Sequence, residues 1–311
     1  MDNDDKHPFM KRFTKGYTFK VLMLILLVLL LLIPLNMIRG LVNERGMTAE
    51  KAESDIMEAW GKELIEAGPI LVIPGVKTEE FITRSEKDGE KVEVVKTPFT
   101  LVISPKKLNI DAIFKTEVRR RGIFSVPLFS GALSLSGSFD PSAAIAGLLP
   151  QETIFPGQAE LVIALSGQKG IRKINASTWG DDQLFFQPGN RGHNLFTSGY
   201  RRTGGSGINA VLPRFEENKE TGFLINIEIQ GGQLIRVLPM AQDTHVSIVS
   251  DWPSPSFQGA FLPNESAIGT ADFSASWDIS YLSRDIPLFL KKYNGDDYRY
   301  DDSLFGVDFF R

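Results

Sequence analysis

Hydrophobic residues follow two contrasting patterns in this chain: one unbroken run near the N-terminus and a series of alternating runs after residue 69. The unbroken run, VLMLILLVLLLLIPLNMI at residues 21–38, contains no charged side chain. A helix of that length, at about 1.5 Å per residue, spans about 27 Å and matches the hydrocarbon core of a bilayer. The run therefore predicts a transmembrane anchor whose partner is the lipid bilayer.

A cleaved signal peptide is the alternative for the same run. The apolar region of a signal peptide covers about 7 to 15 residues and ends in a small-x-small cleavage site. This run is longer, and the sequence LNMIRG at its end contains no such site. We therefore expect an anchor that remains uncleaved.

Basic residues flank the run unevenly. Five basic residues precede the run, namely Lys6, Lys11, Arg12, Lys15 and Lys20. Three follow it closely, namely Arg39, Arg45 and Lys51. Cytoplasmic segments next to a membrane helix carry the excess of lysine and arginine. We therefore expect residues 1–20 to form a cytoplasmic tail and residues after about 40 to lie beyond the inner leaflet, which in a Gram-negative cell means the periplasm.

A second helical pattern follows the anchor, within a predicted juxtamembrane helix over residues 39–68. Thr48 can cap a helix at 47–66, whose apolar residues recur every four positions on one face, namely Ala52, Ile56, Trp60 and Leu64. Gly68-Pro69 is expected to end it, and a break or bend is expected near Gly40 or Gly46. Packing on the following domain explains the apolar face, and binding of a partner is the alternative.

After residue 69 the apolar positions recur every second residue, in segments rich in β-branched and aromatic side chains. Asp88-Gly89, within EKDGEK, predicts a hairpin. Later segments with the same pattern lie at 159–167, 222–231, 233–239, 244–252 and 269–281. We predict a mainly β fold, a large antiparallel β-sandwich-like domain over residues 69–305 that forms two sheets or a duplicated unit.

Composition narrows the chemistry that this domain can perform. The chain has 311 residues, a net charge of −4 and no cysteine. Disulfides, thiol catalysis and zinc–thiolate sites are therefore excluded. The acidic balance disfavours nucleic acid as a partner, because a nucleic-acid-binding domain usually carries a basic patch.

Candidate catalytic and metal-binding motifs are weak. His7, His193 and His245 lack a second histidine at metal-ligand spacing. The SxxK matches at 104–107 and 166–169 lack the accompanying motifs of a penicillin-binding site, and GGSG at 204–207 lacks the spacing of a nucleophile elbow. The acidic string at 294–302 lacks the glutamate that closes an EF-hand loop. We predict no catalytic residue, no metal site and no cofactor, and keep a hydrolase that uses Ser206 or His193 as a minor alternative.

The segment SDWPSPSFQGAFLP at residues 250–263 combines turn-forming and core-forming residues. Prolines stiffen the chain, while aromatic side chains favour burial. We interpret the segment as a rigid plug that covers one end of the β core, with an exposed aromatic surface for a partner as the alternative. Its candidate residues are Trp252, Pro253, Pro255, Phe257, Gly259 and Phe261.

The order of these features resembles the CreD family of cell envelope integrity inner-membrane proteins. The resemblance is carried by LLLLIPLNMIRGLVNERG, by GPILVIP at 68–74, by RRGIFSVPLFSGALSLSGSF at 120–139, by SDWPSPSFQGAFLP and by WDISYLSR at 277–284. It implies a bacterial inner-membrane protein with a large periplasmic domain, followed by further transmembrane helices. Residues 306–311 are accordingly expected to be the stub of a C-terminal membrane region that this chain lacks.

The resemblance implies a role in envelope integrity and envelope stress, and it supplies no catalytic residue to carry over. We therefore expect a non-enzymatic protein whose periplasmic β-rich domain acts through contacts with other envelope proteins. The alternative is a periplasmic ligand sensor or transporter accessory that binds a small envelope molecule and signals through the helix at 47–66.

Overall fold

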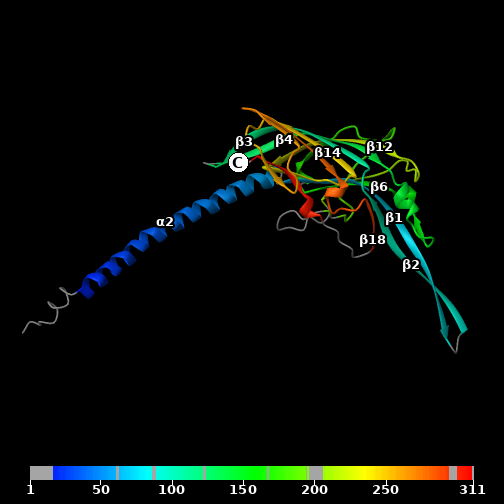
Figure 1. Cartoon of the computed structure of the whole chain (residues 1–311), viewed down its shortest axis with the longest axis horizontal. Coiled ribbons are helices and arrows are strands. Elements are labelled where there is room, and N and C mark those ends of the chain that lie inside the picture. The colour runs from blue at the N-terminus through cyan, green and yellow to red at the C-terminus, as the bar shows by residue number, and fades with distance from the viewer. Residues whose placement is uncertain are drawn as a thin grey trace, which may run out of the picture. The chain divides into compact units, whose positions relative to one another are not determined.

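The computed structural model describes residues 17–60, 63–85, 89–121, 124–166, 168–193, 195, 206–293 and 300–309. The chain divides into two compact units, Met1–Asp55 and Ile56–Arg311. Helix α2 (Tyr17–Trp60) supplies the described part of the first unit, and the second unit is rich in β-strands (Figure 1).

Helix α2 is continuous from Tyr17 to Trp60, with Pro34 inside it. The stretch Phe19–Thr48 has a mean hydropathy of 3.0 over its most apolar window, and none of that window is buried in the protein. It is long and apolar enough to cross a bilayer. A helix that is apolar on every side, as this one is, is typical of a membrane span.

The prediction for the end of this helix was wrong in two respects. The helix continues without interruption through Gly40 and Gly46, and it ends at Trp60 instead of reaching residue 66 or 68. Leu64 and Ile65, expected on the helix, begin strand β1 (Leu64–Ser85). Both are buried, in different apolar clusters, which the alternating faces of a strand permit and a single helical face does not.

The β-rich unit consists of two sheets that pack face to face. The first contains, in spatial order, β10 (Gln187–Pro188), β11 (Gly207–Val211), β6 (Glu160–Leu165), β1, β13 (Leu234–Leu238), β19 (Phe305–Asp308) and β15 (Ser256–Gly259). Three further strands pair beside this path: β2 (Gly89–Ile103) and β5 (Glu152–Ile154) with β1, and β18 (Phe289–Tyr293) with β2. The domain therefore begins with β1 at Leu64, five residues before the predicted start.

The second sheet follows the order β16 (Glu265–Ile268), β17 (Phe273–Ser280), β14 (Asp243–Ser250), β3 (Lys107–Arg121), β4 (Phe124–Phe139), β12 (Thr221–Gly232), β8 (Thr178–Trp179) and β9 (Asp182–Gln183), with β7 (Ile171–Ile174) beside β12. Its strands alternate between buried and exposed residues, as in β17, where Phe273, Ala275, Trp277 and Ile279 are buried. That alternation lets one face cover the core while the other remains in solvent.

The main apolar cluster lies between the two sheets and includes Leu71 and Ile73 from the first sheet and Phe114, Phe129 and Trp277 from the second. The prediction of a mainly β, sandwich-like fold is confirmed. The sheets are mixed, however, because β1 pairs in parallel with β13, and β3 pairs in parallel with β14. Short helical segments occur as α3 (Ser142–Ala146) and as single 3-10 turns at Pro156–Gln158, Gln168–Gly170, Tyr281–Ser283 and Asp301–Ser303.

Strands β1 and β2 form a long hairpin, with a register that runs from Leu71↔Ile103 to Ser85↔Gly89. Asp88, from the predicted turn, lies outside the described residues. Beyond Lys77, β1 pairs with no described strand except β2, because its pairing with β5 ends there. Before Phe99, β2 pairs with no described strand except β1, because its pairing with β18 begins there. In the described pairings, residues 79–85 and 89–95 therefore contact only each other, and we refer to them as the β1–β2 ribbon (Figure 1).

A glutamate is buried inside the sandwich. Glu66 of β1 pairs with Leu165 of β6 and with Val237 of β13, both members of the main core cluster, so its side chain faces the same interior. Its carboxyl group is fully buried, and neither oxygen has a hydrogen-bond partner among the described residues. Burial raises the pKa of Glu66 well above its ordinary value, because the charged form cannot be solvated there.

Glu152 of β5 is an opposite case. It is also buried, but its carboxylate contacts Lys291 Nζ of β18 at 2.5 Å and accepts a hydrogen bond from the backbone N–H of Leu149 at 2.8 Å. Although burial alone raises its pKa, the bonds from Leu149 and Lys291 outweigh it, and the pKa is lowered. This carboxylate stays charged and ties β5 to β18.

We predict that Glu66→Leu stabilises the protein, most strongly at alkaline pH. Because the pKa of Glu66 is raised, this residue destabilises the folded protein least below pH 4.5. The free energy of unfolding then falls as pH rises through the pKa of Glu66 in the folded state. Removing an unpaired buried carboxyl should increase the free energy of unfolding by about 1–3 kcal/mol at pH 8 and by less at pH 5. Urea unfolding of the whole chain, followed by tryptophan fluorescence, measures both values.

Glu80→Leu is the matched control, because Glu80 is an exposed glutamate on the same strand. Its effect should remain within about 0.5 kcal/mol at both pH values. A destabilised Glu66→Leu protein would show that the carboxyl has a favourable interaction in the core.

Candidate functional site

The segment 250–263 lies along the edge of the first sheet. Its central strand, β15, pairs with β19 in the register Phe257↔Val307 and Gly259↔Phe305. At its start, Asp251 Oδ1 accepts hydrogen bonds from the backbone N–H and the hydroxyl of Thr116 in the second sheet, at 2.7 and 2.8 Å. The segment therefore connects the two sheets at one side of the sandwich.

Aromatic side chains of the segment pack against the core. The ring of Phe257 stands edge-on to Phe273 and Trp277, at centroid distances of 6.1 and 5.8 Å. Phe261 stands edge-on to Phe305 at 5.7 Å, and its carbonyl oxygen accepts the indole N–H of Trp277 at 3.3 Å. Edge-to-face pairs at these distances are favourable aromatic contacts, so both phenylalanines anchor the segment.

The remaining predicted residues have different environments. Trp252 is half-buried against the core and donates its indole N–H to the Ser254 carbonyl at 3.0 Å, Pro255 is half-buried, and Pro253 is exposed. Trp252, Phe257 and Phe261 pack against the core, and the role of the segment as a plug stays a prediction. That it also contacts a partner stays a prediction, although Leu262, which sequence reasoning did not single out, is 73% exposed.

Gly259 has no room for a side chain. Its φ is +102°, and a Cβ atom there would lie 2.2 Å from the Leu304 carbonyl oxygen and 2.5 Å from Phe305 Cα. Both the backbone conformation and the close approach to β19 require glycine at this position.

A pocket lies elsewhere in the β-rich unit, where β1 changes partner. Residues Leu64–Ala67 pair in parallel with β13, whereas from Leu71 onward the strand pairs with β2. The pairing of β1 with β6 has an irregularity between these stretches, next to the cis peptide bond Gly68-Pro69. Strands β13 and β2 therefore lie one after the other along the same edge of β1, opposite β6.

The face of β1 that points away from the sandwich interior is apolar. Its residues Ile65, Ala67, Ile70 and Val72 belong to a second buried cluster, separate from the interior of the sandwich. Segments that follow β13 and precede β18 complete this cluster with Leu238, Met240 and Ile286. The outer side of the first sheet is thus covered by chain instead of facing solvent, and the pocket lies within this cover.

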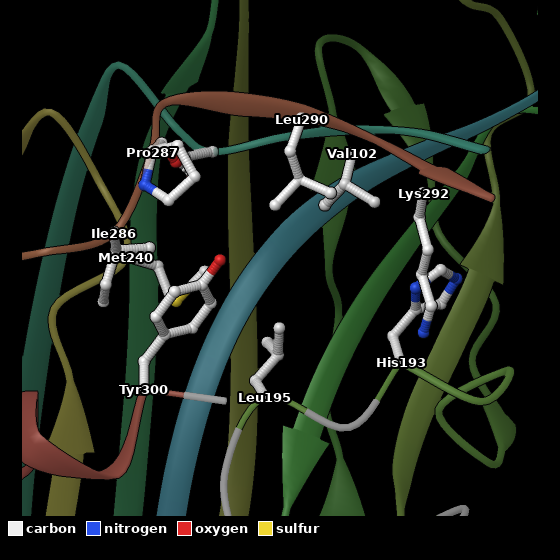
Figure 2. A pocket seen from close by; sticks show the side chains of 10 residues that line it. Val102, His193, Leu195, Met240, Ile286, Pro287, Leu290, Lys292 and Tyr300 are labelled. Atoms are coloured by element: carbon white, nitrogen blue, oxygen red, sulfur yellow. Dashed lines mark hydrogen bonds between the residues drawn. The ribbon is translucent and has the colours of Figure 1, made fainter. Parts of the chain in front are cut away.

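The pocket is mainly aliphatic and small: its cavity measures about 20 Å³, room for about one water molecule. Figure 2 shows Tyr300, Met240 and Ile286 toward one end and His193 and Lys292 toward the other. Its full lining is Val102, Ser104, His193, Leu195, Met240, Ile286, Pro287, Leu290, Lys292 and Tyr300.

Basic side chains surround the mouth. A second hollow of about 220 Å³ shares His193 and Lys292 with the pocket and is lined also by Arg191. Arg191 pairs with Glu160 at 3.0 Å, whereas Lys292 Nζ donates to the Gly192 carbonyl at 3.3 Å and has no carboxylate partner among the described residues. Among the described residues, no aspartate or glutamate lines either hollow.

His193 is only 9% exposed. Burial, and secondly the charge of Lys292, lower the pKa of His193 to about 4. At neutral pH the imidazole is therefore uncharged, and Lys292 supplies the positive charge of the mouth.

Arg284 holds one wall of the pocket. Its guanidinium donates to the carbonyl oxygens of Ile286 at 2.7 Å, Met240 at 2.8 Å and Ala241 at 2.5 Å. Burial lowers its pKa to about 10, so it stays charged at neutral pH. These bonds join the segment before β18 to the segment after β13, and both contribute lining residues.

Of the other candidates from the sequence, Ser104 lines this pocket, whereas His245, Ser166 and Ser206 do not. His245 Nδ1 contacts Asp278 Oδ1 at 2.7 Å on the outer face of the second sheet. Ser104 Oγ donates to the Pro287 carbonyl at 3.3 Å, and Ser166 Oγ donates to the Glu63 carbonyl at 2.6 Å. Ser206 Oγ donates to the Leu165 carbonyl.

The described part of the chain contains no group of three potential metal ligands. His7, the first two residues of GGSG and residues 294–299 of the acidic string lie outside it. Asp301 and Asp302, from the end of the string, lie in a 3-10 turn.

Sequence reasoning identified His193 but missed Lys292, Met240 and Tyr300, since they come from separate segments without a shared motif. Arg284 was visible as the last residue of WDISYLSR, although its bonds to three carbonyl groups were not.

We predict that Gly259→Ala destabilises the fold. A β carbon at φ +102° and 2.2 Å from a backbone oxygen forces either the segment or β19 to move. We expect a loss of about 1–3 kcal/mol in unfolding free energy, measured by urea unfolding. Gly157→Ala is the control, because its β carbon would meet no atom within 4 Å, and an unchanged Gly259→Ala protein would refute the role of this glycine.

Comparison with known proteins gives the family. The family model described as "Inner membrane protein CreD" matches residues 16–311. The curated Inner membrane protein CreD of Escherichia coli (strain K12) is 28% identical over 260 residues, which cover 83% of this chain and 54% of that protein. The chain thus spans about half the length of this relative. From the matched family model and the apolar helix, we conclude that the chain belongs to the CreD family of inner membrane proteins.

Proposed function

We propose that this chain is a cell envelope integrity protein that acts without catalysis, through non-covalent contacts of its β-rich domain with other envelope proteins in the periplasm. Family membership supports an envelope-associated membrane protein. The excess of basic residues before the apolar helix supports a cytoplasmic N-terminus and a periplasmic β-rich domain.

The exposed β1–β2 ribbon is the observation that carries this proposal. It displays Phe81, Val92 and Val94, whose side chains are 50%, 55% and 51% exposed. A two-stranded ribbon without a third strand is marginally stable in water. Burial of these side chains against another protein would stabilise the ribbon and supply the apolar centre of an interface.

We predict that removal of the ribbon abolishes function and preserves the fold. Thr78 pairs with Lys96, so an Asn-Gly turn can join them in place of residues 79–95. In a strain that lacks the gene, this variant should fail to restore envelope integrity, measured by survival under envelope stress. Its melting temperature should stay within a few degrees of that of the unchanged chain, because the removed residues lie outside the core clusters.

Val249→Ser is the control, since Val249 is an exposed apolar residue on a strand of the second sheet. It should complement fully. A ribbon-deleted chain that also complements fully would contradict the proposal.

A direct contact can be detected in cells. A photo-crosslinking amino acid at Phe81 should yield an adduct with another envelope protein, identified by mass spectrometry, because half of this side chain is accessible. The same probe at Ile113, which is exposed on the second sheet, serves as the comparison, and a probe at Leu262 tests the alternative surface of segment 250–263. Equal labelling from Phe81 and Ile113 would argue against a specific contact at the ribbon.

The pocket favours a second candidate function, that of a domain that binds a small envelope molecule and signals through the helix that precedes β1. The aliphatic lining with a cationic mouth is the observation behind it. An increase in melting temperature on addition of an envelope molecule would support this function.

A further inference from the structure

We propose that two copies of this chain pair through the edge of strand β1, so that their β1–β2 ribbons form one four-stranded sheet. The pairing is antiparallel and centred on Ile82, with residues 80–84 of the two copies side by side. Side chains on the faces of the ribbon stay available to other envelope proteins, so this self-pairing goes beyond the proposed function and does not depend on it.

The backbone of β1 can bond to another strand beyond its pairing with β5. The N–H of Thr78 donates to the Gln151 carbonyl at 2.9 Å, on the side of β1 that faces away from β2. Because backbone groups alternate in direction along a strand, those of Glu80, Ile82 and Arg84 point to the same side. Pairing with β5 has ended there, and no described strand takes its place.

This edge lacks the features that usually keep the edge of a sheet unpaired. Natural edge strands carry lysine, proline or a bulge. Residues 79–85 contain neither lysine nor proline, and their register with β2 has no irregularity, whereas Lys96 and Pro98 lie on β2 before its pairing with β18 begins. In Figure 1 the ribbon projects from the sheets, so a second copy can approach the edge of β1.

The charges along the edge are complementary to those of a second copy after a two-fold rotation. Pairing centred on Ile82 places position 80, a glutamate, opposite position 84 of the other copy, an arginine. Opposite charges directly across two strands stabilise a sheet, and like charges destabilise it. Pairing centred on Glu80 or on Arg84 would place like charges opposite each other. Within its own hairpin Glu80 lies opposite Val94, so it has no cross-strand charge partner there.

The same register satisfies the backbone of both copies. In an antiparallel pair, opposite residues whose backbone groups face the partner strand exchange two hydrogen bonds. Ile82 pairs with its own counterpart, and Glu80 pairs with Arg84 twice, which gives about six hydrogen bonds. The product is a sheet in the order β2, β1, β1, β2, and a sheet of more than two strands is more stable than a single hairpin.

Disulfide crosslinking in membranes tests the pairing, because the chain has no cysteine of its own. Ile82→Cys in the whole chain should form a covalent dimer on oxidation with copper phenanthroline. Hydrogen-bonded partners in antiparallel strands have Cα atoms about 5.5 Å apart, which a disulfide can span. Val94→Cys is the matched control, because Val94 is exposed on the same ribbon but two β2 strands would lie about 14 Å apart or more. We expect at least tenfold more dimer from Ile82→Cys than from Val94→Cys.

Differently tagged copies test the register. Glu80→Cys and Arg84→Cys chains should crosslink to each other when both are present in one membrane. Each variant alone should give at least tenfold less dimer, because identical positions would lie four residues apart along the strands, about 14 Å.

A charge reversal tests the complementarity. Glu80→Lys, added to Ile82→Cys, should reduce the dimer yield at least threefold, because it places lysine opposite arginine at both ends of the interface. Glu93→Lys is the matched control, because Glu93 is exposed on β2 of the same ribbon and away from the edge of β1, and it should leave the yield unchanged. Melting curves show which variants remain folded.

The outcomes separate this pairing from the proposed function. Equal dimer yields from Ile82→Cys and Val94→Cys would indicate random collision and overturn the pairing. A photo-crosslinking amino acid at position 82 that labels another envelope protein instead of a second copy would also overturn it, while supporting the proposed function. Efficient Ile82→Cys dimers, in a protein whose ribbon-deleted variant still complements fully, would uphold the pairing and contradict the proposed function.

Discussion

Burial of both faces of β1 is the constraint on which the rest of the β-rich unit depends. One face contributes Leu71 and Ile73 to the interior of the sandwich, and the other contributes Ile70 and Val72 to the second apolar cluster. A strand buried on both sides needs cover on both sides. The second sheet covers one face, and the segments around Met240 and Ile286 cover the other. The pocket exists because this second cover is built from loops and separate strands instead of a continuous sheet.

Two buried glutamates show how differently the fold treats charge. Glu152 is surrounded by donors and remains ionised, so its contribution is lost as pH falls through its lowered pKa. Glu66 has no donor within reach among the described residues, and its contribution changes in the opposite direction. A leucine or valine at position 66 would continue the apolar row formed by Leu165, Val237 and Phe305. A charged residue type therefore occupies a position where the fold favours an apolar one. Such mismatches are typical of functional or strained positions.

Sequence patterns predicted the coarse architecture well, because the spacing of apolar residues and the length of an apolar run can be read from neighbouring residues alone. The uncharged run predicted the apolar helix, and alternation such as that of Phe273, Ala275 and Trp277 predicted the sandwich. The helix end was mispredicted because Trp60 and Leu64 satisfy a helical repeat, while Leu64 and Ile65 equally fit a strand buried on both faces. Glu66 looked like a solvent-facing residue of that helix. The pocket depends on contacts among β2, β13, β18 and the loops, and no local pattern encodes such contacts.

The arginine that secures the pocket wall has a consequence for how the protein can change over evolutionary time. Arg284 bonds to the carbonyl oxygens of Ile286, Met240 and Ala241, and every residue type supplies such an oxygen. The side chains at these positions can therefore be exchanged while the attachment of the wall persists. A pocket fastened through its backbone leaves its lining open to selection, so members of one family can differ in what they accommodate without rebuilding the scaffold that surrounds it.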